Sequence, residues 1–189
     1  MLSMSNAPEN TGDRILAAAA SCILDFGVDR VTLAEIARRA GVSRPTVYRR
    51  WPDTNAIMSA LLTRHITDVL REVPVDGDDR ESLVKQAVAV ADRLRRDRLV
   101  MTVMHSEWAR VYITERLGAS QQVLIEGLAG RLEVAQRAGS VRPGNPRQLA
   151  TMVLLIAQST IQSADIVKPI LDSEALADEL TYSLNGYLA

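Results

Sequence analysis

The sequence is poor in the residues that enzymes and metal sites most often use. It contains one cysteine, Cys22, which excludes a disulfide framework and a thiolate zinc site within the chain. Its two histidines, His65 and His105, lie far apart, and there is no HExxH pair, phosphate-binding glycine loop or nucleophile elbow. We therefore expect no bound metal, no cofactor and no enzymatic activity.

Aromatic residues are also scarce, at 4% of the 189 residues, although hydrophobic residues reach 47% and charged residues 24%. The last two values are ordinary for a soluble globular protein. Sheets depend on aromatic and β-branched side chains, whereas this chain is rich in Ala, Leu, Arg and Glu, which favour helices. The composition predicts an all-α fold.

The sequence lacks a run of about 20 apolar residues, the length that spans a bilayer. Its first ten residues are polar and show neither the basic region nor the apolar stretch of a signal peptide. We expect a cytoplasmic protein with no membrane partner, whose residues 1–10 form a disordered tail.

Apolar residues recur at spacings of three and four along most of the chain, which is typical of amphipathic helices. Cys22 belongs to such a stripe in the first helix, so we expect it to pack in a core rather than act as a reactive thiol. Helices are predicted at residues 11–26, 33–40, 44–50, 53–72, 80–97, 100–112, 114–138, 146–167 and 173–188.

Local capping signals define two short helices in the N-terminal third. Thr32 can accept from the amide of Glu35 while the Glu35 side chain returns to the Thr32 amide, so a helix begins at the next residue. It ends before Gly41, and Ser43 then caps a second helix that tolerates Pro45 in its first turn. Two helices of about eight residues, joined by a short turn that contains glycine, are typical of a helix-turn-helix.

The net charge is −1, but the charges are unevenly distributed. Residues 36–52 contain five arginines and no acid, so this segment carries +5 and the rest of the chain −6. A run of charge alone is usually a solvated surface. Its coincidence with the helix-turn-helix instead favours a surface that binds DNA. The arginines are Arg38, Arg39, Arg44, Arg49 and Arg50.

The second helix of this motif carries the side chains that major-groove recognition requires near its N-terminal end. Arg44 can make a bidentate contact to a guanine, and the hydroxyl and methyl groups of Thr46 can contact bases. Pro45 adds a rigid apolar edge. The other candidates offer hydroxyl groups, helix-start amides or positive charge to phosphates. They are Thr32, Ser43, Tyr48, Arg49 and Arg50.

This region resembles the DNA-binding region of tetracycline-repressor-type (TetR family) transcriptional regulators. The resemblance covers residues 11–62 and is most specific from Val31 to Pro52, where the sequence reads VTLAEIARRAGVSRPTVYRRWP. It implies a helix-turn-helix DNA-binding domain at residues 11–52 and a ligand-binding and dimerisation domain at residues 53–189. It also implies about nine helices, a homodimer built from the last two, and a small molecule that releases the operator.

One position departs from the family's pattern. After the aromatic-proline pair, family members often have a lysine that grips phosphate near the start of the next helix, and Thr54 stands here. That contact is therefore weaker in this chain or is supplied by Arg50.

Polar and aromatic side chains on otherwise apolar helices indicate where a small molecule could bind, because ligand pockets are mostly apolar with a few polar groups. Met101, Met104, His105 and Trp108 are spaced so that they would share one face of a predicted helix. The alternative is that this Met and Trp stripe is simply core. The candidate pocket residues are His65, Met101, Met104, His105, Trp108, Gln158 and Gln162.

The predicted helix at residues 146–167 is apolar on more than one face, and the last helix adds leucines at four-residue intervals. A helix that is apolar all round must be buried. A second subunit would cover it; the alternative is a monomer whose core uses the same two helices. Candidate dimer residues are Met152, Leu155, Leu176, Leu180 and Leu184.

Together these features predict a homodimeric transcriptional repressor that binds a pseudo-palindromic operator in double-stranded DNA and is released by a small-molecule effector. Ligand in the C-terminal domain would move the connector helix at residues 53–72 and alter the separation of the two DNA-binding motifs. A helical ligand-binding or adaptor protein without DNA affinity is the alternative, but it leaves the arginine segment without a role.

Overall fold

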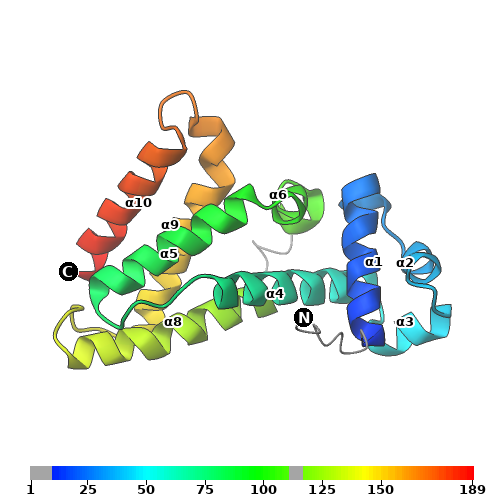
Figure 1. The fold of residues 1–189 in the computed structure, drawn as a ribbon, viewed down its shortest axis with the longest axis horizontal. Coiled ribbons are helices and arrows are strands. Elements are labelled where there is room, and N and C mark those ends of the chain that lie inside the picture. Colours follow the sequence, from blue (N-terminus) through cyan, green and yellow to red (C-terminus); the bar gives the residue numbers. More distant parts are fainter. Residues whose placement is uncertain (1–9, 111–116) are drawn as a thin grey trace, which may run out of the picture.

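The computed structural model describes residues 10–110 and 117–189, and these residues form nine α-helices, one short 3-10 helix and no strand. The all-α fold is confirmed. Figure 1 shows a small N-terminal group of helices and a larger C-terminal group, with the long helix α4 (Thr54–Glu72) extending between them. Residues 1–9 of the predicted tail lie outside the described residues, and the domain boundary at residue 52 remains a prediction.

The N-terminal group, here called the head, comprises the first four helices of the chain. They are α1 (Thr11–Phe26), η1 (Val28–Arg30), α2 (Leu33–Ala40) and α3 (Arg44–Arg50). The other helices are here called the body. They are α5 (Arg80–Arg96), α6 (Arg98–Met104), α8 (Ala119–Arg137), α9 (Pro146–Val167) and α10 (Ser173–Leu188).

Side-chain caps set the boundaries of the head helices. Thr32 Oγ1 accepts from the Glu35 amide at 3.2 Å, and α2 ends at Gly41, which has φ 63° and ψ 37°. This left-handed conformation suits glycine and lets the Val42 amide donate back to the Ala37 carbonyl at 3.0 Å, as in a Schellman motif. The return bond that we predicted from Glu35 to the Thr32 amide is wrong, because the Glu35 carboxylate accepts from an arginine of the same helix instead.

The head has its own hydrophobic core. Ile15, Ile36 and Val47 are fully buried at the centre of α1, α2 and α3. The core continues beyond the predicted boundary into the first half of α4 and into one face of α6. Cys22 is also fully buried there, and burial raises the pKa of its thiol, which agrees with a packing role.

The body encloses a second core between the far half of α4 and helices α5, α8, α9 and α10. The helix predicted over residues 100–112 is wrong as a single element. It begins at Arg98, ends at Met104, and a new turn covers residues 107–110 after a break. Ser106 causes the break because its hydroxyl accepts from the Ala109 amide at 3.2 Å, as a helix cap does. Residues 111–116 of the two predicted helices lie outside the described residues.

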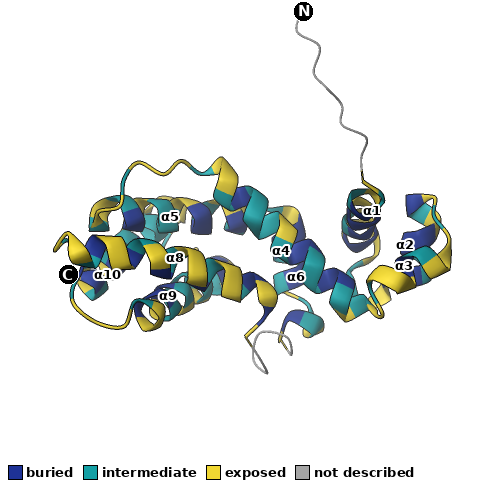
Figure 2. Ribbon diagram, turned by 90° about the horizontal axis from the view of Figure 1, so that it is seen from below, coloured by how far each residue is buried: buried dark blue, intermediate teal, exposed yellow. Residues whose placement is uncertain are grey.

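Helix α9 is apolar yet poorly covered by its own chain. By length and composition it is the one helix of the described residues that could cross a bilayer, but only 22% of its most apolar 18-residue window is buried. One such helix is weak evidence for a membrane, since helices of soluble proteins pass the same test. Figure 2 shows further exposed residues along the outer faces of α8 and α10.

Candidate nucleic-acid interface and ligand cavity

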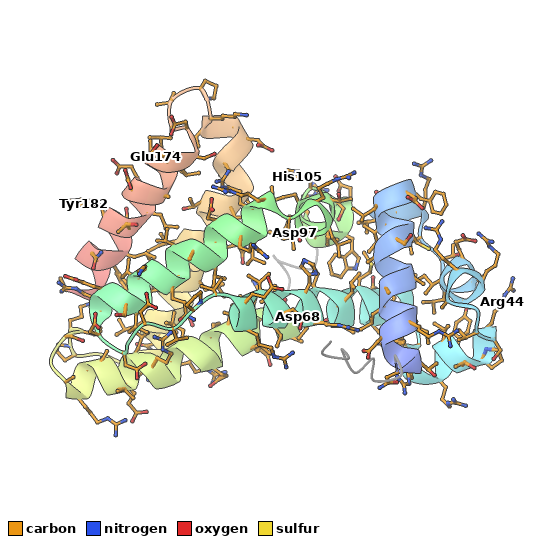
Figure 3. All side chains as sticks on the ribbon, viewed as in Figure 1. Arg44, Asp68, Asp97, His105, Glu174 and Tyr182 are labelled. Carbon is orange, nitrogen blue, oxygen red and sulfur yellow. The ribbon has the colours of Figure 1, made fainter. Side chains whose placement is uncertain are left out.

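Helix α3 lies at the outer end of the head with most of its surface in solvent. Val47 is fully buried and anchors one face of the helix in the head core. Arg44 is exposed at the N-terminal end, and Figure 3 shows it at the edge of the molecule, pointing away from the body. Tyr48, Arg49 and a third arginine continue the exposed surface toward the C-terminal end. The sequence-predicted DNA residues of α3 are therefore accessible to solvent.

The first turn of α3 is fixed by two hydroxyl groups. Ser43 Oγ accepts from the Thr46 amide at 3.3 Å and lies 2.7 Å from Thr46 Oγ1. Pro45 is exposed in the same turn, where its missing N–H costs no hydrogen bond. The Thr46 hydroxyl is thus engaged within the helix, which leaves its methyl group as the simpler contact for a base.

The five arginines of the segment fall into two groups. Arg38 binds the Glu35 carboxylate through two nitrogens, at 2.8 and 2.6 Å, and this hydrogen bonding lowers the pKa of Glu35. Arg39 lies 2.5 Å from Asp25 of α1. The remaining three form no ion pair with any described residue. The positive charge available to DNA is therefore that of Arg44, Arg49 and Arg50.

The beginning of α1 joins the end of α3 in this surface. A methyl group on Gly12 would overlap the guanidinium of Arg50, so the two residues are in close contact. Asn10 Oδ1 accepts from the Gly12 amide at 3.0 Å and holds the first turn of α1 in place. Nothing in the local sequence pattern indicates this contact, because the two helices are far apart in the chain.

A shallow groove separates α2 from α3 on the same end of the head. Thr32, Arg38 and Arg44 line it, together with Val42 at its floor. Thr32 is exposed at the start of α2, as the prediction of a phosphate contact requires. Thr54, the position that departs from the family's pattern, lies in the first turn of α4 and is half-buried.

The body contains a cavity of about 290 Å³ between α4, α5, α8 and α9. Of the seven residues predicted to line a pocket, Met104, Trp108 and Gln158 do so. The other four do not, and for these the structure corrects the prediction. They are His65, Met101, His105 and Gln162.

The break in the predicted helix explains two of these corrections. Because α6 ends at Met104, His105 closes the helix as an exposed residue, and Trp108 belongs to the next turn. The four residues of the predicted stripe therefore do not share one helical face. Met101 lies on α6 and packs against the body core without reaching the cavity.

The third correction concerns His65, whose ring is engaged elsewhere. His65 Nε2 lies 2.7 Å from Asp97 Oδ2, which links α4 to the N-terminal cap of α6. Burial raises the pKa of Asp97, but hydrogen bonds from the Val100 amide and His65 lower it more, so that its pKa lies below the ordinary value. The fourth residue, Gln162, lies one turn beyond Gln158 and outside the cavity.

Sequence reasoning missed most of the polar residues that do line the cavity. Ser120, Gln121 and Arg131 all lie on α8, and Gln86 lies on α5. Gln121 Nε2 donates to Gln158 Oε1 of α9 at 3.0 Å. Ser120 and Arg131 are eleven residues, or about three helical turns, apart and so share one face of α8, and this spacing is the signal that could have identified them.

The cavity wall is connected directly to the head. Trp108 lines the cavity, and its indole Nε1 donates to Asn55 Oδ1 in the first turn of α4 at 2.7 Å. Helix α6 has a similar double role. Leu99 and Val103 pack in the head core, whereas Val100 packs in the body core.

The predicted dimer residues divide into exposed and buried groups. Met152 and Leu155 of α9 are 41% and 49% exposed, and Leu176 of α10 is half-buried. Leu180 and Leu184 are 5% and 0% exposed, which corrects their prediction as dimer residues. They face the chain's own core because α10 packs against α5 and α9 through this leucine stripe.

Comparisons with known proteins agree with this architecture. The model of a family described as bacterial regulatory proteins, tetR family, matches residues 15–61. The HTH-type transcriptional regulator Rv2250c of Mycobacterium tuberculosis is 80% identical over 188 residues, which cover 100% of each chain. A relative of such identity and coverage shows that the two chains belong to one family, and the role named for this relative, transcriptional regulation, is a non-enzymatic one.

Solved structures show the same fold at low identity. The R. erythropolis transcriptional repressor QsdR, from the TetR family, matches with a TM-score of 0.69 and 17% identity over 97% of this chain and 98% of its own. FadR from Bacillus subtilis, in complex with stearoyl-CoA, matches with a TM-score of 0.65 and 19% identity over 93% and 98%. Together with the family model and the relative of 80% identity, this shared fold establishes that the chain belongs to the tetR family of bacterial regulatory proteins and is a helix-turn-helix transcriptional regulator.

Proposed function

We propose that this regulator represses transcription in the cytoplasm by binding a pseudo-palindromic operator as a homodimer. The observation that carries the proposal is α3, whose Arg44 stands exposed at the N-terminal end while Val47 fixes the opposite face in the head. Donors at that end of a recognition helix meet base edges in the major groove. Half-sites separated by about one helical turn, ~34 Å, or by a multiple of it, would suit a pair of such helices.

The remaining residues of this surface would hold phosphates. Arg49 and Arg50 carry charge without an ion-pair partner among the described residues, and Tyr48 is 53% exposed beside them. Thr32 and Ser43 cap the two helices of the motif and present hydroxyl groups close to helix-start amides, which attract anions. Pro45 and the Thr46 methyl group would fit against thymine methyl groups.

The exposed apolar face of α9 supports the homodimer. Met152, Leu155 and Ile166 recur at helical spacing, and Ile166 is 79% exposed. Tyr182 of α10 is exposed to the same extent, and Figure 3 shows it pointing outward from that helix. An exposed apolar surface of this extent is typical of a protein–protein interface. A second copy of the chain would bury this surface and would bring two heads into one homodimer.

The cavity supports release by a small molecule. A ligand that fills it would press on Trp108, which is bonded to Asn55 next to the head. It would also press on α6, which packs in both cores. Ligand binding would thus change the position of the head relative to the body, and operator occupancy would fall by the ligand's differential affinity for the two states.

Selection of bound DNA tests the proposal. Purified protein is incubated with genomic fragments at fixed salt, and the bound fragments are sequenced and measured by gel shift. We expect a short set of sequences with dyad symmetry, each bound by two subunits. Arg44→Ala should relax that preference at one base pair of each half-site, while Arg137→Ala, which changes an exposed arginine at the end of α8, should leave the preference unchanged. Protein that retains no double-stranded fragment in low salt would contradict the proposal.

A further inference from the structure

The shape of the cavity restricts the molecules that it can hold. Its wall follows one face of α8 from Gln121 to Arg131, which at ~1.5 Å per residue is about 15 Å. Leu62, Ile66 and Leu70 of the neighbouring helix α4 also line the cavity. A volume of about 290 Å³ drawn out over that length is a narrow slot. It suits an extended chain better than a wide ring system.

The described residues that line the cavity offer no unbalanced charge. Among the described residues that line it, Arg131 alone is ionisable, and all three of its guanidinium nitrogens are engaged. They donate to Asp78 Oδ1 at 3.0 Å, to the Gly77 carbonyl and to Gln86 Oε1. A cationic ligand would find no carboxylate in this wall, and an anionic one would have to displace Asp78 from an acidic loop. A buried charge without a partner is strongly disfavoured, so an uncharged ligand fits best.

The other end of the slot presents hydrogen-bond donors. The Gly118 amide donates to Gln121 Oε1 at 2.9 Å, so the Gln121 amide nitrogen must be the group that meets Gln158 Oε1. This fixes the orientation of Gln158, whose own NH₂ group has no partner among the described residues. Ser120 stands beside them as the buried polar residue of the described chain, 5% exposed, with a hydroxyl likewise unpartnered there. Both residues line the cavity, so a ligand atom there could accept from the two groups.

From these three features we infer that the cavity takes an uncharged, linear aliphatic molecule with a carbonyl group at one end. The carbonyl oxygen accepts from Gln158 Nε2 and Ser120 Oγ, and the chain lies along α8 toward Arg131. Bonds of about 1.5 Å advance an extended carbon chain by roughly 1.3 Å each, so about eleven carbons fill the slot. Such a molecule would be the effector of the proposed repressor. Its effect on operator binding rests on the proposed function, whereas its binding to the cavity does not.

Four probes of matched length test the inference by calorimetry on the full chain. They are methyl decanoate, decanoate, decylammonium and undecane, at about pH 7.5, where the acid and the amine are both charged. We expect the ester to bind at least tenfold more tightly than either ion and measurably more tightly than the alkane. Tightest binding of decanoate or decylammonium, or no binding of the ester, would overturn the inference.

Two variants with the same change of charge locate the site. Gln158→Glu replaces the donor amide with a carboxylate and should weaken the ester at least tenfold while improving decylammonium. Gln162→Glu makes the same change one turn further along α9, outside the cavity, and should leave all four affinities unchanged. Equal effects of the two variants would contradict the assignment. Should Gln158→Glu fail to fold, as judged by circular dichroism, Ser120→Ala provides the test, with an expected loss for the ester and none for undecane.

Operator binding is measured in a separate experiment, so that a failure of the proposed ligand class can be distinguished from a failure of the proposed release of DNA by ligand. Ester that binds the protein without weakening its hold on selected DNA would contradict ligand release and leave the ligand class standing. Release of DNA by a charged probe, with the ester inactive, would contradict the ligand class and leave ligand release standing.

Discussion

The head and the body are built from the same kind of helix but differ in how completely they are packed. Ile15, Ile23 and Ile36 of the head are all fully buried, and a side-chain cap begins each of its three α-helices. The body leaves a cavity between four helices and an apolar face on α9. This contrast fits the proposed roles, because a region that presents a fixed surface can be filled completely, whereas a region that binds a ligand and a second subunit keeps apolar surface uncovered.

The largest effect on stability is expected when a buried apolar residue of the body is replaced by arginine, and an exposed apolar residue provides the comparison. Leu180→Arg places an unpaired charge in the core, which costs several kcal/mol and should unfold the body. Leu155→Arg changes a residue that is 49% exposed and should give a folded monomer. Circular dichroism and analytical ultracentrifugation separate the two outcomes. A folded dimer in the Leu155→Arg protein would place the interface elsewhere.

Truncation of one side chain in each region compares their packing directly. Ile36→Ala removes a fully buried side chain from the head and should cost about 2 to 5 kcal/mol of unfolding free energy. Leu128→Ala shortens a side chain of the cavity wall that is only half-buried, so it should cost less, roughly 1 kcal/mol. Urea denaturation measures both. Equal losses would show that the cavity wall is packed as tightly as the head.

The head surface can be divided into base recognition and phosphate binding. Arg44→Ala should cost about 1 to 3 kcal/mol on the preferred operator and relax the preference at one base pair. Arg50→Ala should weaken all sequences alike and reduce the salt dependence by about one unit. Competition binding at several salt concentrations measures both effects. Unchanged base preference in the Arg44→Ala protein would remove this residue from recognition.

The smallest effect is expected at the link between the two regions. Trp108→Phe keeps an aromatic ring in the cavity wall but deletes the donor to Asn55, a neutral hydrogen bond worth about 1 kcal/mol. Operator affinity without ligand should stay the same, while release by ligand should become several-fold weaker. Asn55→Ala should do the same, and the double variant should add nothing further. Full additivity would show that the two residues act independently.

Local signals explain why the head was predicted well from the sequence. Thr32, Gly41 and Ser43 each act within four residues of their own position, so the bounds of α2 and α3 follow from the chain alone. The placement of Arg44 on an exposed helix end follows from the same bounds. The contact between Gly12 and Arg50 could not be predicted, because it depends on how α1 and α3 cross.

A local helix cap and tertiary packing determine the two features of the body that the sequence did not predict. The periodicity around Met101 to Trp108 fits one helix equally well, but the Ser106 hydroxyl ends that pattern because it donates to the Val103 carbonyl and accepts from the Ala109 amide. Leu155 and Leu180 have the same side chain on similar apolar helices, yet one faces solvent and the other the core. Which face of such a helix meets its own chain depends on the positions of all its neighbours.

Two arginines of the head form ion pairs with carboxylates of the same chain. In a protein that binds DNA, such pairs lower the affinity for non-specific sequences. Asp25 and Glu35 sit as built-in counter-ions on Arg39 and Arg38, which are thereby kept from adding to indiscriminate attraction along any duplex. A DNA-binding protein with fewer unpaired positive charges dissociates sooner from non-specific sites and therefore spends more of its time free to reach its operator.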